Sequence, residues 1–345
     1  MPVDADIVPG AFRVGVIGGG SWGTVLAGLL AAKGFPVDLW VFEPEVAQQI
    51  NTHRENRAFL PGIPLSPSLT ASNDLASAAG GKDLLVVVVP SHVIRETSAG
   101  MAGRLGAQTM VVSASKGIEN KTHLTMTGVL KETLGVGDDR VAVLSGPSFA
   151  VEVARKITTV VTVASRNPAL AQMVQQVFAT PYFRVYTSGD TIGVELGGSV
   201  KNVIAIAAGI IDGLGLGLNT RAALITRGMT EIRRLGKRLG ANPRTFTGLA
   251  GYGDLILTCT GDLSRNHTLG RQIAAGRKLS DILGGMRMVA EGVRTARSVY
   301  NLSGKLGVEM PICHQTYRIL YEDLPPREAL YQLMTRDLKP ELDDD

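Results

Sequence analysis

The stretch Val14-Gly15-Val16-Ile17-Gly18-Gly19-Gly20-Ser21-Trp22-Gly23-Thr24 decides the fold of the first half of this 345-residue chain. A short apolar strand leads into Gly18-x-Gly20-x-x-Gly23, and a helical pattern follows at once. Gly18 permits a tight turn, Gly20 lets backbone N–H groups approach a diphosphate, and Gly23 lets the helix pack closely on the strand. The pattern predicts the opening of a βαβ unit that binds a dinucleotide.

Strand-like and helical segments alternate outward from this motif. Further strands are expected at Val37–Val41, Leu84–Val89, Met110–Ser113, Val141–Leu144, Thr158–Ala164 and Phe183–Tyr186. Helices are expected at Thr24–Lys33, Glu45–Arg54, Val93–Leu105, Thr122–Leu134 and Asn167–Ala179. Such alternation is typical of a doubly wound, Rossmann-type parallel sheet with helices on both faces.

Strand-like runs stop near residue 190, and long Ala/Leu/Ile/Gly-rich helical patterns follow. Helices are expected at Thr191–Ile211, Thr220–Leu239, Asp254–Thr260, Ser264–Ala275, Glu291–Leu306, Ile312–Glu322 and Arg327–Thr335. The sequence therefore predicts an α/β domain over 1–190 and an all-helical domain over 191–345. The most apolar run, Val203–Leu218, is interrupted by Asp212, so we expect a buried helix and no integral membrane segment.

The composition limits the class of function. Hydrophobic residues make up 45% of the chain and charged residues 19%, which excludes a disordered protein. The net charge of +4 comes without a run of five Lys or Arg, so no nucleic-acid partner is predicted, and a small anionic substrate fits. Cys259 and Cys313 have neither a disulfide pattern nor metal-ligand spacing, which indicates a reduced, cytoplasmic setting and no metal.

Glu43 and Arg54, which both follow the second predicted strand, bear on the choice of cofactor. Glu43 lies 20 residues after Gly23, where an acid contacts the ribose hydroxyls of NAD and would repel a 2′-phosphate. The alternative is an exposed acid that favours the dipole of the next helix. Arg54, one helix later, would accommodate a 2′-phosphate if it reached one, so NAD and NADP both stay open.

Other polar residues follow the predicted carboxyl ends of later strands, where ligands of open α/β sheets gather. His92 follows the long central strand and is expected to line the cofactor site more than to catalyse. Lys116 follows the next strand, where it either meets a substrate or lies solvated in a loop. Ser148, in Ser145–Ala150, is expected to cap a short helix.

Lys201 is the most unusual residue of the helical half, because it lies inside a strongly apolar helix. Burial disfavours the charged form of a lysine and lowers its pKa, which produces a general base near neutral pH. The alternative is a lysine whose stem reaches to solvent. The neighbouring Gly197 and Gly198 allow close backbone approach and favour the functional interpretation.

Two further stretches of the helical half carry polar side chains. Asp254 and Thr258 share one helix face at i, i+4; Asp254 is either a helix N-cap or a partner for a lysine and a substrate hydroxyl. Ser264 is expected to cap a helix whose first turn carries Arg265 and Asn266. A helix N-terminus, a hydroxyl, a guanidinium and an amide together make an anion site.

Taken together, these stretches resemble the bacterial type of NAD(P)-dependent glycerol-3-phosphate dehydrogenase. The resemblance runs from about Phe12 to Tyr331 and is strongest in Leu249–Asn266. It is carried as well by Gly18–Thr24, Ser115–Glu119, Ser145–Ala150, Gly197–Asn202 and Ala222–Arg227. One departure matters: many relatives have Arg or His where this chain has Phe42, which weakens the case for NADPH.

The resemblance implies roles for individual residues. Lys201 matches the proton donor and acceptor, assisted by Lys116 and Asp254. The residues expected to bind substrate are Lys116, Gly146, Lys201, Asn202, Asp254, Thr258, Ser264, Arg265 and Asn266. Those expected at the cofactor are Gly18, Gly20, Ser21, Trp22, Gly23, Phe42, Glu43, Lys116, Gly146, Ser148, Ala150, Arg265, Val289 and Glu291.

The activity implied is reversible reduction of dihydroxyacetone phosphate to sn-glycerol 3-phosphate, supplying phospholipid synthesis, in a cytoplasmic homodimer. One alternative is a related two-domain dehydrogenase of β-hydroxyacids, which would need a carboxylate site in place of Ser264–Asn266. Another is a non-catalytic dinucleotide sensor, which would be expected to lack Lys116, Lys201 or Asp254.

Overall fold

The computed structural model describes residues 7–286 and 288–341. Contacts divide the chain into two units. The first comprises Met1–Lys116 with Leu124–Val194, and the second comprises Gly117–His123 with Glu195–Asp345. The short segment Gly117–His123 thus groups with the helical half, although it lies within the first half of the sequence.

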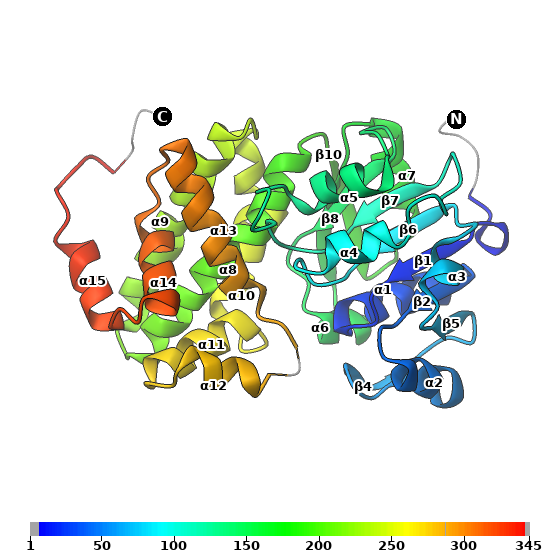
Figure 1. The fold of residues 1–345 in the computed structure, drawn as a ribbon, viewed down its shortest axis with the longest axis horizontal. Coiled ribbons are helices and arrows are strands. Elements are labelled where there is room, and N and C mark those ends of the chain that lie inside the picture. The colour runs from blue at the N-terminus through cyan, green and yellow to red at the C-terminus, as the bar shows by residue number, and fades with distance from the viewer. Residues whose placement is uncertain (1–6, 287, 342–345) are drawn as a thin grey trace. The chain divides into compact units, whose positions relative to one another are not determined.

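The first unit is built on an eight-stranded sheet (Figure 1). From one edge to the other the strands are β10 (Phe183–Ser188), β9 (Thr159–Ala164), β8 (Val141–Ser145), β7 (Met110–Ser113), β6 (Leu84–Val87), β1 (Val14–Ile17), β2 (Val37–Trp40) and β5 (Leu69–Ser72). From β1 the chain extends the sheet to one side through β2 and β5 and then returns to β6 on the other side. The topological switch point therefore lies between β1 and β6, where open α/β sheets bind ligands.

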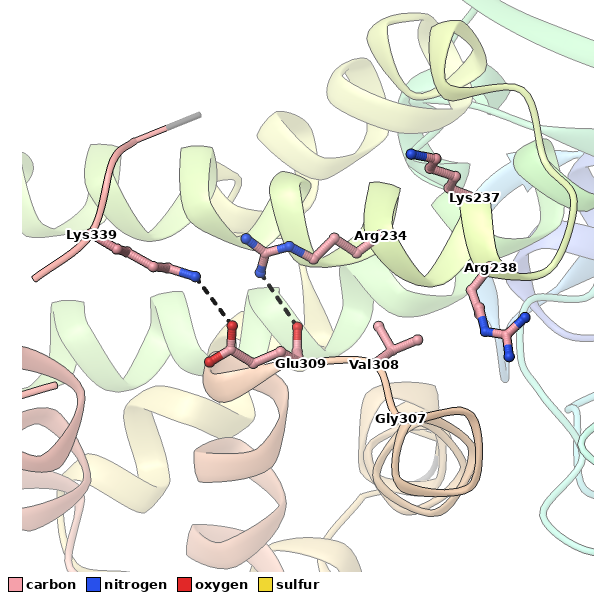
Figure 2. Close-up of a pocket in the computed structure, with 7 residues that line it drawn as sticks. All are labelled: Arg234, Lys237, Arg238, Gly307, Val308, Glu309 and Lys339. Atoms are coloured by element: carbon pink, nitrogen blue, oxygen red, sulfur yellow. Dashed lines mark hydrogen bonds and ion pairs between the residues drawn. The ribbon is translucent and has the colours of Figure 1, made fainter. Parts of the chain in front are cut away.

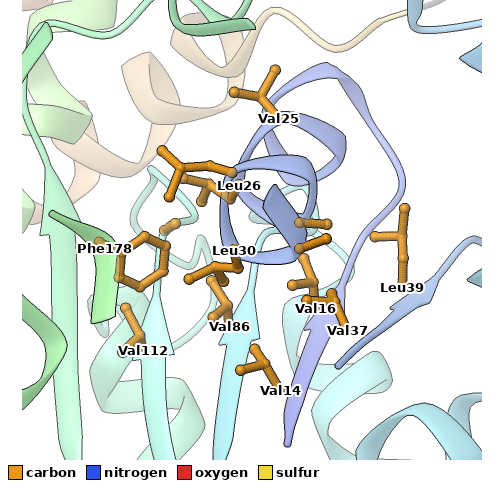
Figure 3. Close-up of a cluster of buried hydrophobic side chains, with 14 of the residues drawn as sticks. Val14, Val16, Val25, Leu26, Leu30, Val37, Leu39, Val86, Val112 and Phe178 are labelled. Atoms are coloured by element: carbon orange, nitrogen blue, oxygen red, sulfur yellow. The ribbon is translucent and has the colours of Figure 1, made fainter. Parts of the chain in front are cut away.

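Helices cover both faces of this sheet because residues along each strand point alternately to its two sides. One buried cluster joins Val14 and Val16 of β1 to Leu26 and Leu30 of the first helix, α1 (Ser21–Ala32), together with Phe178 of α7 (Pro168–Phe178) (Figure 3). The opposite cluster joins Leu85, Val87 and Val111 of the strands to side chains of the helices over 75–79, 94–99 and 126–134. The helices of the unit are α1 (Ser21–Ala32), α2 (Pro44–His53), α3 (Leu75–Ala79), α4 (Ile94–Ala99), α5 (Met126–Leu134), α6 (Ala150–Ala154) and α7 (Pro168–Phe178), with a 3-10 turn at Pro9–Ala11. The predicted Rossmann-type architecture is confirmed.

The sheet departs from a fully parallel arrangement at one edge. β9 pairs antiparallel with β8, and β10 pairs parallel with β9. A parallel crossover needs a dozen or more residues and usually a full helix. The connection from β8 to β9 contains only the five-residue α6, so the chain reverses direction instead.

Three strands on the other side were not expected from the sequence. β3 (Glu55–Asn56) and β4 (Leu60–Pro64) form an antiparallel hairpin, and β5 pairs with β2 at the sheet edge. Pro64 ends β4, and Ser66, Pro67 and Ser68 lie between β4 and β5; such residues are typical of turns. Pairing with neighbouring strands therefore stabilises these short strands more than their own hydrophobic pattern does.

The second unit is helical (Figure 1). Its elements are α8 (Thr191–Gly213), α9 (Gly217–Arg238), η2 (Pro243–Thr247), η3 (Leu249–Gly253), α10 (Asp254–Thr260), α11 (Arg265–Ala274), α12 (Leu279–Gly284), α13 (Glu291–Leu306), α14 (Pro311–Tyr321) and α15 (Pro326–Met334). The first four residues of α8 group with the first unit. Of these elements, η2, the π-helical turn η3 and α12 were not expected from the sequence.

The central helix of this unit is α8. By length and composition it is apolar enough to cross a membrane, but 94% of its most apolar 18-residue window is buried inside the protein. Such burial is typical of a core helix. Glycines bring α11 against it: a Cβ on Gly209 of α8 would collide with the carbonyl oxygen of His267, and one on Gly270 of α11 with that of Ile206.

Candidate active site

The glycine-rich turn between β1 and α1 has the geometry that the motif predicts. Gly18 has φ +128°, and a Cβ there would lie 2.8 Å from the carbonyl oxygen of Val88, just after β6. A Cβ on Gly23 would collide with the carbonyl oxygen of Gly18, so only glycine permits this approach of helix to strand. Beside Gly20, by contrast, open space lies within 4 Å of the Cβ position. The turn is thus packed against the end of β6 and against the start of α1, but it is open beside Gly20 at the helix N-terminus. An open helix N-terminus suits a diphosphate.

A buried asparagine that the sequence analysis missed fixes this turn. Asn56 of β3 donates through Nδ2 to the carbonyl oxygen of Gly19 (2.8 Å) and to the hydroxyl of Thr24 (2.8 Å). Its Oδ1 accepts the backbone N–H of Phe59, and the Ser21 hydroxyl donates to the carbonyl oxygen of Phe59 (2.6 Å). The β3–β4 hairpin therefore holds the glycine turn from the side. No local motif marks Asn56, because the two groups to which its amide donates lie more than 30 residues away.

Trp22, in the first turn of α1, lies partly buried against the sheet. Its ring centroid is 6.5 Å from that of Phe183 on β10. This ring contact anchors the start of α1 within the first unit. Packing therefore explains in part why a tryptophan occupies this position of the motif.

The carboxyl end of β2 presents Phe42 and Glu43. Phe42 is 75% exposed and packs edge-to-face with Trp40 at 6.3 Å. Glu43 occupies the N-cap position of α2 without a side-chain capping bond, so its carboxylate is not used by the helix. Arg54 lies at the C-cap of the same ten-residue helix, roughly 15 Å away by helix rise, and donates to the carbonyl oxygen of Leu69. Arg54 therefore lies at the opposite end of α2 from Glu43, with its guanidinium bonded to β5.

The ends of β7 and β8 bring Lys116, Gly146 and Ser148 together. Lys116 Nζ lies 3.4 Å from the carbonyl oxygen of Gly146, to which the Ser148 hydroxyl also donates (2.9 Å). Gly146 has φ +145°, and a Cβ there would lie 2.9 Å from Cα of Val161. The expectation that Ser148 caps a helix is wrong: Phe149 is the N-cap of α6, which begins at Ala150. His92 is exposed in the turn after β6.

Lys201 is buried in the second unit, with 5% of its surface exposed. Its Nζ donates to Asp254 Oδ1 (2.5 Å) and to the hydroxyl of Thr258 (2.5 Å). The Thr258 hydroxyl in turn donates to the backbone carbonyl oxygen of Asp254 (2.6 Å). The amine is thus ion-paired and hydrogen-bonded away from bulk water, which is how a buried charge becomes tolerable.

The local sequence explains how α8 and α10 bring these groups together. A Cβ on Gly197 of α8 would collide with the carbonyl oxygen of Ala250, so glycine lets η3 lie directly on the helix. The π-helical turn leads straight into α10, and Asp254 is its first residue, with Gly253 at the N-cap position. Of the two alternatives for Asp254, the N-cap is therefore wrong, and its carboxylate binds Lys201. Cys259 on α10 is buried, and burial raises its pKa to about 12, so it is a thiol with a structural role.

The N-terminus of α11 has the cap that the sequence predicts. The Ser264 hydroxyl accepts the backbone N–H of His267 (3.3 Å), which confirms Ser264 as the N-cap. Arg265 donates to the carbonyl oxygen of Val289 (2.9 Å), and the Glu291 carboxylate acts on its guanidinium electrostatically. Three residues expected at the cofactor, Arg265, Val289 and Glu291, thus lie together.

The two asparagines of this cluster bind each other. Asn266 donates through Nδ2 to Asn202 Oδ1 (3.0 Å), and its Oδ1 accepts the backbone N–H of Gly292 at the start of α13 (3.0 Å). Asn202 follows Lys201 on α8, so this chain of bonds ties α8 to the starts of α11 and α13. The side chain of Asn266 is engaged within the protein, which favours its backbone N–H as the group offered to an anion.

The predicted site residues therefore form two groups. The glycine turn, Ser21, Trp22, Phe42, Glu43, Lys116, Gly146, Ser148 and Ala150 belong to the first unit. Lys201, Asn202, Asp254, Thr258, Ser264, Arg265, Asn266, Val289 and Glu291 belong to the second. Within the described ranges 7–286 and 288–341, no group of three or more His, Cys, Asp or Glu residues is placed to hold a metal ion.

Two family models match the chain. Residues 13–171 match the family model for the N-terminus of NAD-dependent glycerol-3-phosphate dehydrogenase, and residues 190–331 match the model for its C-terminus. The chain belongs to the NAD-dependent glycerol-3-phosphate dehydrogenase family. The predicted membership and the nicotinamide dinucleotide cofactor are confirmed.

Similar proteins of this family cover nearly the whole chain. A glycerol-3-phosphate dehydrogenase [NAD(P)+] of Syntrophobacter fumaroxidans is 57% identical over 331 residues, which are 96% of this chain and 97% of the relative. One of Geobacter sulfurreducens is 57% identical over 330 residues, 95% of this chain and 98% of the relative. The crystal structure of glycerol-3-phosphate dehydrogenase from Coxiella burnetii has a TM-score of 0.90 at 40% identity, covering 94% of this chain and 99% of that one.

Proposed function

We propose that the chain catalyses the reversible interconversion of sn-glycerol 3-phosphate and dihydroxyacetone phosphate with NAD(H) or NADP(H). The observation that carries the proposal is the buried Lys201, hydrogen-bonded to Asp254 and Thr258, on the same helix as an asparagine that is tied to the N-terminus of α11. A proton donor and an anion site in one unit suit a phosphorylated ketone. Membership of the family supports the same substrate.

The first unit supplies residues that fit a nicotinamide dinucleotide. The accessible helix N-terminus at Gly20 would hold the diphosphate, and Glu43 would contact the adenine ribose. When bound, the nicotinamide supplies a hydride to the carbonyl carbon or takes one from the alcohol carbon. Lys116 lies after the carboxyl end of β7, 3.4 Å from the carbonyl oxygen of Gly146, and would face the nicotinamide half of such a cofactor.

Lys201 handles the proton. As an ammonium it donates a hydrogen bond, and then a proton, to the C2 oxygen of dihydroxyacetone phosphate as that oxygen becomes a hydroxyl. As a neutral amine it accepts the proton of the glycerol 3-phosphate hydroxyl in the reverse direction. Asp254 and Thr258 hold the amine in place and stabilise its charged form.

The start of α11 binds the phosphate of the substrate in this proposal. The backbone N–H groups of the first turn and the guanidinium of Arg265 are suited to phosphate oxygens. Asn202, whose Oδ1 is occupied by Asn266, would donate through Nδ2 to the substrate. Binding energy from the phosphate, remote from the reacting carbon, orients the carbonyl for reaction.

A lysine substitution tests the proposal. Lys201→Met should lower kcat for dihydroxyacetone phosphate reduction by about 10²- to 10⁴-fold, with little change in the Kd for NADH. Lys82→Met is the matched control, because Lys82 is a second buried lysine with an acidic partner, Asp38 (2.6 Å). If Lys201→Met turned over near the wild-type rate, the assignment of the proton donor would fail. Absence of activity toward dihydroxyacetone phosphate with both NADH and NADPH would reject the substrate.

The wider setting belongs to the same proposal. We propose that the enzyme works in the cytoplasm as a homodimer and supplies glycerol 3-phosphate for phospholipid synthesis. Its two cysteines are buried free thiols, as suits a reducing compartment. Sedimentation of the purified protein at micromolar concentration measures the assembly state directly.

A further inference from the structure

A pocket of about 580 Å³ lies in the second unit, and none of its lining residues belongs to the cluster around Lys201 (Figure 2). The last two turns of α9 contribute Arg234, Lys237 and Arg238. The connection between α13 and α14 contributes Gly307–Glu309, and Lys339 comes from the segment after α15. A volume of this size is in the range of small-molecule sites.

The lining carries four cations and one carboxylate. That carboxylate, Glu309, is already engaged by Lys339 (3.2 Å) and by Arg336 outside the pocket. Arg234 donates to the backbone carbonyl oxygen of Glu309 (3.4 Å), as Figure 2 shows. Across the described parts of the chain, neither Lys237 nor Arg238 has an acidic partner within 4 Å, and both are exposed. The pocket therefore has a surplus of positive charge.

The carbonyl oxygens at the end of α9 do not need these cations as hydrogen-bond partners. Cations near a helix C-terminus commonly offset the helix dipole or bond the last carbonyl oxygens. Here Ala241 N–H bonds the carbonyl oxygen of Gly236 and Gly240 N–H bonds that of Lys237, with Gly240 at φ +87°. The last turn is thus closed by the backbone itself.

The spacing of the cations adds a cost. Arg234 and Arg238 are at i, i+4 and Arg234 and Lys237 at i, i+3, so three like charges share one helix face, an arrangement that destabilises a helix unless an anion lies among them. We propose that this pocket, lined by Arg234, Lys237, Arg238 and Lys339, binds a phosphate-bearing ligand. Guanidinium forks and lysine ammonium groups together suit a phosphate group. Its source is either a free phosphorylated small molecule or the headgroup of an anionic phospholipid.

The test compares two exposed cation pairs. Lys237→Glu/Arg238→Glu reverses the charge of the pocket, and Arg277→Glu/Lys278→Glu makes the same change of charge at exposed residues between α11 and α12. Each protein is titrated with inorganic pyrophosphate by calorimetry and sedimented with vesicles of phosphatidylglycerol and phosphatidylcholine, or of phosphatidylcholine alone. The neutral variant Lys237→Gln/Arg238→Gln, checked by thermal melting, guards against loss of fold.

We expect the pocket variants to bind one of these probes about tenfold more weakly than wild type, or not at all, while the control pair binds as wild type does. Loss of pyrophosphate binding alone identifies a free phosphorylated ligand, and loss of binding to the anionic vesicles identifies a headgroup. Equal behaviour of the pocket and control variants with both probes overturns the proposal. Because the readout is binding by a pocket distinct from the Lys201 cluster, its failure and the failure of the proposed activity are separable.

Discussion

At the residue scale, the bond between Lys201 and Thr258 is open to a clean substitution. Thr258→Val keeps the shape of the side chain but removes the hydroxyl that accepts from Lys201 at 2.5 Å. A hydrogen bond to a charged group is worth enough that kcat should fall by about tenfold or more, with little change in KM for the phosphorylated substrate. Steady-state kinetics measure both constants.

Thr260→Val is the matched control for this change. Thr260 lies on the same helix, is exposed, and donates to the carbonyl oxygen of Ile256 in its own helix. We expect it to leave kcat unchanged. A Thr258→Val enzyme as fast as the Thr260→Val enzyme would show that the amine needs only Asp254.

Glu43 makes a second prediction at this scale. Its carboxylate caps no backbone group, so Glu43→Gln should not disturb α2. Removing a negative charge near the ribose 2′ position should raise kcat/KM with NADPH relative to NADH by about tenfold. Glu45→Gln, in the first turn of the same helix, is the control and should leave the ratio unchanged. An unchanged ratio in Glu43→Gln would place the carboxylate away from the ribose.

Some of the site residues could be predicted from the sequence, and others could not. The glycines, Lys201 and Ser264 reveal themselves by local context, since each is explained by its own turn or helix. Asn56 does not, because its bonds reach back across the sequence to Gly19 and Thr24. The engagement of Asn266 by Asn202 and Gly292 likewise depends on three separate helices meeting.

At the element scale, glycine controls how closely α8 and α11 pack. A Cβ on Gly209 would strike the backbone of His267, which cannot rotate out of the way. Gly209→Ala should therefore lower the free energy of unfolding by about 1–3 kcal/mol and raise KM for the phosphorylated substrate, because α11 carries Ser264 at its start. Urea unfolding and steady-state kinetics check the two effects.

Gly304→Ala on α13 gives the control, since nothing lies within 4 Å of its Cβ position. Alanine there should leave stability equal or slightly higher, because it reduces the freedom of the unfolded chain. If both alanine variants were equally stable, α8 and α11 would not be in the contact described.

Element boundaries followed the sequence best where hydrophobic pattern and end signals agreed. α13 spans Glu291–Leu306 as expected, with Gly307 in a left-handed conformation after it. The expected helix Val93–Leu105 shortens to α4 (Ile94–Ala99), because Gly100 and Gly103 interrupt it. The reversal of β9 depends on the length of a connection, which a strand's own residues do not encode.

At the scale of the whole molecule, one buried carboxylate makes stability depend on pH. Glu231 of α9 accepts the backbone N–H groups of Ile312 (2.7 Å) and Cys313 (3.0 Å) at the start of α14. Burial raises its pKa from 4.5 to about 7, against these two bonds, which lower it. The folded protein therefore binds this proton more tightly than the unfolded chain does between these two pH values.

The contribution of Glu231 to stability should be greatest below pH 4.5 and fall as the pH rises through about 7, by an amount on the order of 3 kcal/mol. Glu231→Gln removes this titration. The unfolding free energy of wild type minus that of the variant should therefore fall from pH 5 to pH 8. Urea unfolding across that range measures it, and comparison with the variant cancels the other titrating groups. A constant difference would contradict the raised pKa.

The segment Gly117–His123 limits how this protein can be recombined. Gly117 N–H bonds the Ser199 hydroxyl (2.8 Å) and the Ser298 hydroxyl donates to the carbonyl oxygen of Ile118 (2.7 Å), so seven residues encoded in the first half fold with the second. A chimaera that exchanges the helical half by a single junction at Val194 keeps Gly117–His123 from one parent and its bonding partners from the other. Transfer of the helical unit therefore needs two segments, Gly117–His123 and the chain from Glu195 onward. Chimaeras of distant family members should fold only when both segments come from the same parent.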